Sequence, residues 1–263
     1  MPPSLDIRGD IAAAQLAFYV LIAAISFFFT VRHAFERDAG FFFLFFFAII
    51  RIAGGALIIA AELTRMSTVN LFISAYILFP AGLGVLMLSY IGFLGLAGQH
   101  TVSEYRRTSH TLRIIAFFAV AALALSIAGG LEGSINGNDN LGLILRRVSA
   151  GTYAGTYLLL LYATAVSWSY RFIMRSYRRH LLYAVTFALL PLGVRAAYAV
   201  LSAWSSSDLF GLELSSNPDL AQFQPITGNY LTYLLMGLVM EFLVALICLY
   251  FSTIGMRRRH RHH

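Results

Sequence analysis

Lysine is missing from the 263 residues, so all nineteen basic residues are arginines. A retinal pigment needs a lysine amine for its Schiff base, which excludes a rhodopsin-type pigment. The one cysteine, Cys248, excludes a disulfide within the chain. None of the seven histidines pairs with another at i+3 or i+4 inside an apolar segment. We therefore expect no metal site and no cofactor.

Charge is also scarce. Charged residues make up 12% of the chain and hydrophobic residues 59%, whereas a soluble domain has about 25% charged residues. The apolar residues form blocks of about twenty, the length of a helix that crosses a bilayer. Strict alternation, typical of a membrane barrel, is absent. We expect one all-α domain over residues 1–263, a seven-helix transmembrane bundle with spans near 11–30, 41–61, 69–97, 112–131, 149–172, 181–203 and 230–254.

The arginines outside these blocks predict the orientation of the bundle. The N-terminal segment and the loops after the second, fourth and sixth blocks hold few arginines, and loop 204–228 has acidic residues but no basic one. The opposite face holds most of them. Because short basic loops stay in the cytoplasm, we expect the N-terminus outside and the C-terminus in the cytoplasm. The opening segment MPPSLDIRGD lacks the basic region of a cleaved signal, so we expect the first helix to be retained.

The formal net charge of +7 does not call for nucleic acid as a partner. Its most concentrated part is the tail MRRRHRHH, which follows the last apolar block. Such a tail anchors the orientation and attracts anionic lipid of the inner leaflet, at about 1 kcal/mol per basic residue. We expect membrane lipids as partners, in the plasma membrane or an endomembrane.

Four charged residues are the candidates for an intramembrane site: Arg51, Glu62, Arg195 and Glu241. An arginine at a helix centre costs about 2.5 to 3.5 kcal/mol even on the lenient insertion scale. Arg51 and Glu62 are three helical turns apart and share a face. Arg51 and Glu241 lie at similar depth, and Arg195 is expected one to two turns nearer the outside. The spacing predicts a buried network of opposite charges.

Two interpretations of this network remain open. It is a structural lock, supported by glycines that allow close helix approach: Gly54, Gly55, Gly82, Gly84, Gly129, Gly151 and Gly155. Alternatively, it lines a polar intramembrane cavity that binds a small or lipidic ligand. The predicted ligand-binding residues are Arg51, Glu62, Arg195, Tyr198, Tyr233 and Glu241.

Three motifs resemble a known family. RIAGG at 51–55, PLGVRAAY at 191–198 and MGLVMEF at 236–242 resemble a family of fungal seven-span integral membrane proteins of unknown function. The resemblance implies the seven-helix fold and a fungal origin, and it supplies no activity.

A weaker likeness links the chain to fungal membrane-bound terpene cyclases, which protonate their substrate with acidic residues of early and late helices. It implies Glu62 or Glu241 as a general acid, although no local motif matches and the nearby arginines would keep these carboxylates ionised. Our first hypothesis is therefore a receptor-like protein, and the alternative is a cyclase-like enzyme. Transport is less favoured, because no inverted repeat is evident.

Overall fold

The apolar blocks form long helices, because only a helix satisfies its own backbone hydrogen bonds in lipid. The computed structural model describes residues 7–32, 39–63, 68–98, 106–135, 139–174, 176–206, 218–224 and 228–259. The first six long helices are α1 (Ile7–Arg32), α2 (Ala39–Leu63), α3 (Thr68–Gly98), α4 (Arg106–Ile135), α5 (Asp139–Ser169) and α6 (Ser176–Ser205). A continuous last helix comprises α8 (Tyr230–Thr232), the π-helical segment η1 (Tyr233–Val239) and α9 (Met240–Arg259), and a short helix α7 (Pro218–Ala221) precedes it.

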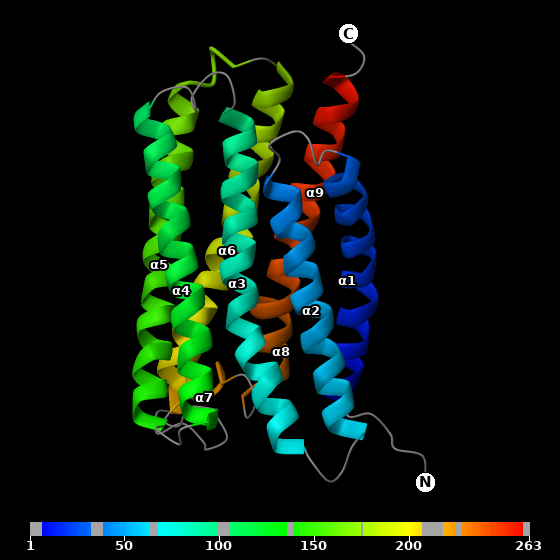
Figure 1. Ribbon diagram of the computed structural model, residues 1–263, viewed down its shortest axis with the longest axis vertical. Helices are drawn as coiled ribbons and strands as arrows, with labels where there is room; N and C mark the ends of the chain where they lie inside the picture. The colour runs from blue at the N-terminus through cyan, green and yellow to red at the C-terminus, as the bar shows by residue number, and fades with distance from the viewer. Residues whose placement is uncertain are drawn as a thin grey trace.

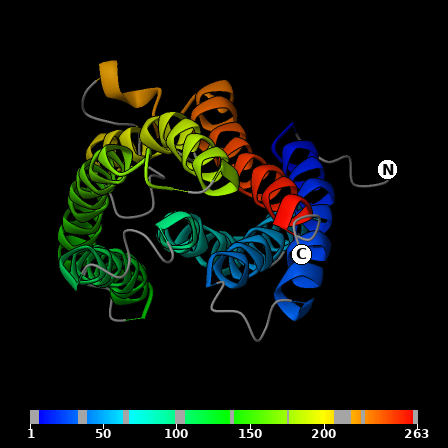
Figure 2. The same cartoon turned by 90° about the horizontal axis from the view of Figure 1, so that it is seen from above.

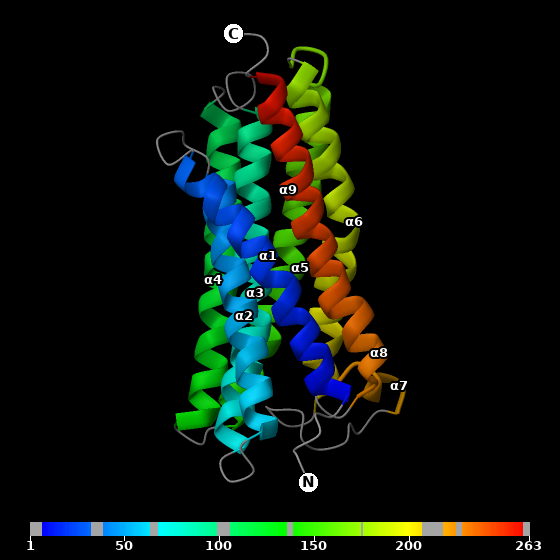
Figure 3. The same cartoon turned by 90° about the vertical axis from the view of Figure 1, so that its right-hand side faces the viewer.

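Successive long helices run up and down and pack side by side (Figure 1). The helix α1 begins at one end of the bundle and α9 ends at the other (Figure 3). Seen from above, α3 lies inside an arc formed by the other helices (Figure 2). It contacts α2, α4, α5, α6 and α9, and every residue from 81 to 90 is buried. The helix α3 is therefore the central helix of the bundle.

Six helices of the described chain are long and apolar enough to cross a membrane: Gly9–Arg32, Ala39–Leu63, Ile73–Gly98, Ser109–Glu132, Arg178–Ser205 and Tyr230–Phe251. The chain is thus a multi-pass helical membrane protein, as the sequence predicts. The helix α5 is equally long but carries many Tyr, Thr, Ser and Gly residues and is not among the six. Seven crossings and the orientation of the termini stay predictions.

The largest shift of an expected boundary is at the start of the fifth helix. The fifth helix was expected over 149–172, yet α5 runs over Asp139–Ser169. Arg146 and Arg147, assigned to an outer loop, therefore lie inside this helix. Arg146 donates to Ser202 Oγ at 3.2 Å and Arg147 to the carbonyl of Ser206 at 3.5 Å. These bonds to the end of α6 let the helix begin well before its apolar stretch.

The closest helix approach uses glycines other than those expected. A Cβ added to Gly92 of α3 would lie 2.5 Å from backbone atoms of Gly40 in α2. Ser89 Oγ donates to the carbonyl of Gly40 at 2.9 Å in the same contact. In contrast, a Cβ at Gly54, Gly151 or Gly155 would meet nothing within 4 Å, so the prediction of close approach at these three positions is wrong.

Parts of the segments used for the orientation lie outside the described residues. They are residues 1–6, 33–38, 64–67, 99–105, 136–138 and 175, parts 207–217 and 225–227 of the acidic loop, and the end of the basic tail from residue 260.

Candidate functional site

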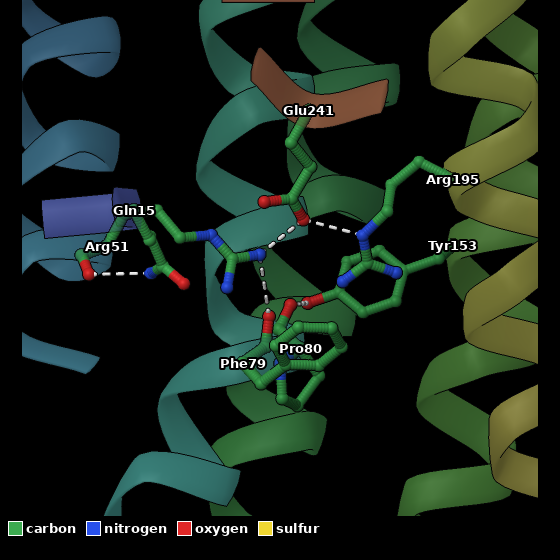
Figure 4. Close-up of polar contacts among 7 residues, drawn as sticks. All are labelled: Gln15, Arg51, Phe79, Pro80, Tyr153, Arg195 and Glu241. Atoms are coloured by element: carbon green, nitrogen blue, oxygen red, sulfur yellow. Dashed lines mark hydrogen bonds and ion pairs between the residues drawn. The ribbon is translucent and has the colours of Figure 1, made fainter. Parts of the chain in front are cut away.

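The two intramembrane arginines meet one carboxylate oxygen in the middle of the bundle (Figure 4). Glu241 Oε1 accepts a hydrogen bond from Arg51 Nη2 and another, at 2.5 Å, from Arg195 Nε. The three residues come from α2, α6 and the start of α9. We call these three residues the ion cluster.

The ion cluster is fully enclosed by protein. Arg51 is 3% exposed, and Arg195 and Glu241 are each 0% exposed. Breaking a buried ion pair by removing one partner costs about 3 to 5 kcal/mol, because the other charge is left uncompensated. The network predicted from helical spacing is therefore present for three of its four members.

One aromatic ring lies against both guanidiniums. The Cζ atom of Arg51 is 4.9 Å from the ring centre of Phe79, and the Cζ atom of Arg195 is 4.7 Å from it. Cations near an aromatic face are stabilised by the ring quadrupole. Sequence reasoning missed Phe79, because a phenylalanine in an apolar helix resembles any other core residue. In the sequence, only its position directly before Pro80 distinguishes it from other core phenylalanines.

The helix α3 accommodates Arg51 through a glycine and a carbonyl. A Cβ at Gly82 would lie 3.0 Å from Cζ, Nε and Nη2 of Arg51. Arg51 Nη2 also donates to the carbonyl of Phe79 at 3.3 Å. A larger residue at position 82 would displace the guanidinium, so Gly82 gives room to the charge rather than to a neighbouring backbone.

The helix α1 holds the ion cluster from the opposite side. Gln15 Nε2 donates to the backbone carbonyl of Arg51 at 2.9 Å. The Tyr19 ring packs edge-on against Phe47 of α2 at 5.5 Å and against Phe242 of α9 at 6.2 Å, measured between ring centres. Both Gln15 and Tyr19 are buried. Gln15 was not predicted, because one amide in an apolar segment gives little signal.

The other predicted residues divide into two groups. Tyr198 and Tyr233 border the ion cluster through Phe79, with ring centres 6.4 Å and 5.2 Å from the Phe79 ring. Tyr198 also lies 5.6 Å from Arg195 Cζ. Glu62 is half-buried at the end of α2, about 16 Å along the helix from Arg51 at 1.5 Å per residue. Its Oε2 atom has no hydrogen-bond partner among the described residues.

A groove of about 410 Å³ lies between α1 and the last helix. Its walls are mostly apolar and include the π-helical segment. The lining residues are Asp10, Ile11, Ala14, Gln15, Phe18, Tyr19, Leu234, Leu238, Val239 and Phe242. Gln15 and Tyr19 thus face the groove and also border the ion cluster.

This geometry limits the chemistry of the site. Glu241 Oε1 accepts hydrogen bonds from two guanidiniums, as a carboxylate anion does, whereas a general acid must donate a proton. A general acid at Glu241 is therefore disfavoured, and the enzyme alternative depends on Glu62 alone. Among the described residues, no group of three or more His, Cys, Asp or Glu side chains could hold a metal ion.

Residues 5–259 match the model of the family described as Domain of unknown function (DUF7702). The chain belongs to this family. No curated protein and no solved structure matches it. The DUF7702 assignment confirms the resemblance to an uncharacterised family over nearly the whole chain, while the fungal origin stays a prediction.

Proposed function

We propose that this DUF7702 protein is a receptor-like membrane protein that binds a lipidic ligand in the groove between α1 and the last helix. The observation that carries the proposal is the shared wall formed by Gln15 and Tyr19, which links an apolar groove to a buried ion cluster. The bilayer supplies the ligand laterally. With the predicted orientation, the basic loops and tail face the cytoplasm and its anionic lipids.

The dimensions of the groove favour one apolar chain. Small-ligand sites measure about 300 to 1,000 Å³ and are lined mainly by apolar side chains with a few polar groups. The groove has about 410 Å³. Its polar members are Asp10, Gln15 and Tyr19. An acyl or isoprenoid chain with a compact polar end matches this distribution.

The π-helical segment supports a ligand-sensitive last helix. Single-turn π segments occur frequently at functional sites. Leu234, Leu238 and Val239 of the groove belong to η1, and Glu241 follows directly after it. A ligand that separates this segment from α1 would act on the helix that carries Glu241. A ligand shifts such an equilibrium only through a difference in affinity between two states.

The experiment is photolabelling of the full chain in nanodiscs with a clickable, diazirine-bearing fatty acid. We expect labelled peptides from both walls of the groove, namely residues 10–19 and 234–242. The variant Ala14→Trp fills the groove from α1 and should reduce this labelling at least fivefold.

Ala13→Trp is the matched control. Ala13 and Ala14 are neighbouring exposed alanines of α1, but only Ala14 lines the groove. Equal labelling of wild type and both variants would show that the groove holds no specific ligand, and would favour the interpretation of the ion cluster as a structural lock.

A further inference from the structure

The ion cluster carries an uncompensated positive charge. Arg51 and Arg195 are both cationic, and among the described residues both form their ion pairs with the single carboxylate of Glu241. A buried charge without a counterpart is expensive at this depth in a membrane protein. The cluster therefore favours an additional anion.

Arg195 provides two donors for such an anion. Its Nη1 and Nη2 atoms are buried and have no hydrogen-bond partner among the described residues. They lie on the side of the guanidinium turned toward Tyr153 and Pro80, away from Glu241 (Figure 4). A buried charged donor without a hydrogen-bond partner costs more free energy than a neutral donor.

A small cavity lies on this side of Arg195. It measures about 30 Å³ and is enclosed by α3, α4, α5 and α6. The polar lining residues are Ser126, Arg146, Ser149, Tyr153, Arg195 and Ser202. Arg146 and Ser202 lie nearer the end of the bundle where α5 begins and α6 ends. A second arginine thus stands between the Arg195 guanidinium and that end.

The size of the cavity restricts its occupant. A cavity needs about 10 to 15 Å³ to hold one water molecule, so a space of about 30 Å³ admits only a few particles of that size. Water would satisfy the Arg195 donors but would leave the charge of the ion cluster uncompensated. A halide ion is only slightly larger than water. It accepts hydrogen bonds from the Arg195 donors and also compensates the positive charge of the ion cluster.

We propose that the cavity between α3, α4, α5 and α6 is a binding site for a chloride-sized anion, held by Arg195 Nη1 and Nη2 with Arg146 at its entrance. The site is separate from the lipid groove and does not depend on the function proposed for it. Large anions such as gluconate and sulfate do not fit.

The test is the melting temperature of the full chain in nanodiscs, measured with a fluorogenic thiol dye that reacts with the buried Cys248 on unfolding. Gluconate is replaced by chloride or bromide at constant ionic strength and pH. We expect a saturable rise of about 3 °C or more with either halide, and no saturable rise with sulfate, whose general stabilising effect does not come from binding. An equal melting temperature in gluconate and chloride would overturn the proposal.

A pair of alanines tests the location. Ala199→Leu fills the cavity from α6 and should abolish the halide response, because Ala199 lines the cavity. Ala197→Leu is the control, since Ala197 is exposed on the same helix and lies outside the lining. A full response in Ala199→Leu would place the anion elsewhere and overturn the assignment.

A pair of arginines gives a second test if Ala199→Leu does not fold. Arg146→Gln should raise the half-saturating chloride concentration at least fivefold. Arg147→Gln should leave it unchanged, because Arg147 lies outside the cavity lining and donates to the carbonyl of Ser206. Equal half-saturation in the two variants would contradict the role of Arg146.

Discussion

At the scale of single residues, the ion cluster depends unequally on its members. Glu241 pairs with both arginines, and among the described residues it is the only carboxylate with which either arginine pairs. Removal of Arg51 leaves a neutral Arg195–Glu241 pair. Removal of the Glu241 charge leaves two buried cations without their shared carboxylate. The carboxylate is therefore the member whose loss costs most.

Glu241→Gln should lower the free energy of unfolding by about 3 to 5 kcal/mol, and Arg51→Met should lower it less. The double variant should recover about 0.5 to 3 kcal/mol relative to the sum of the single losses, because the residues contact each other. Reversible unfolding in mixed detergent micelles measures all three values.

Glu62→Gln is the control for these changes. Glu62 lies three turns from Arg51 on the same helix, and its substitution should add independently to that of Arg51. Simple additivity for the Arg51 and Glu241 pair as well would contradict the coupling.

The sequence predicted the charged members of the site and its two neighbouring tyrosines, but not the roles of the other neutral residues. An arginine in an apolar segment is conspicuous, and its distance from the helix ends can be compared with that of a glutamate in another helix. Phe79 and Gly82 belong to residue types that occur throughout such helices, and Gln15 is a single amide in an apolar segment. Their roles follow from contacts between helices, which the linear sequence does not specify.

At the scale of helices, α5 supplies donors to backbone carbonyls beside two helix prolines. Tyr153 Oη donates to the carbonyl of Pro80 at 3.2 Å, and Tyr157 Oη donates to the carbonyl of Leu189, close to Pro191, at 3.3 Å. Proline removes one helix hydrogen bond and disturbs its neighbours. The polar face of α5 therefore supplies hydrogen-bond donors to α3 and α6, the helices against which it packs.

Tyr153→Phe should lower the unfolding free energy by about 0.6 to 1.7 kcal/mol, the value of a hydrogen bond between membrane helices. Tyr162→Phe on the same helix should have no measurable effect, because Tyr162 is 60% exposed. Parallel unfolding curves in detergent test both variants. Equal losses would show that the hydroxyl of Tyr153 contributes no stability.

The helices themselves were predictable where apolar blocks define them, but their irregular parts were not. The early start of α5 depends on arginines that bond to α6. The π-helical segment η1 also escaped prediction, because hydrophobic blocks that are apolar on every side give no periodicity from which a change of helical register could be detected.

At the scale of the whole molecule, the number of membrane crossings depends on α5. Its antiparallel neighbours α4 and α6 are both apolar enough to cross, and α5 packs along each of them. A helix held between two spans meets the lipid with only part of its surface and can carry more polar residues than an isolated span.

Single cysteines at the two ends of α5, in a Cys248→Ala background, test the crossing and the orientation together. Asn140 and Phe172 are both exposed. In sealed microsomes, whose outer face is cytoplasmic, an impermeant maleimide should label Phe172→Cys directly. It should label Asn140→Cys only after detergent is added.

Each alternative gives a different pattern. Direct labelling of both positions would mean that α5 does not cross and that the bundle has six spans. The reverse pattern would mean that the N-terminus is cytoplasmic.

The position of Glu241 in the chain also bears on biosynthesis. Arg51 enters the bilayer 190 residues before its partner, an interval of about 10 to 40 s at the usual rate of translation. Until the last helix leaves the ribosome, the two arginines of the nascent protein lack the carboxylate with which they pair. The last segment to be made thus supplies the carboxylate that both arginines share, and a prematurely terminated product would present arginines without this carboxylate to the quality-control machinery of the membrane.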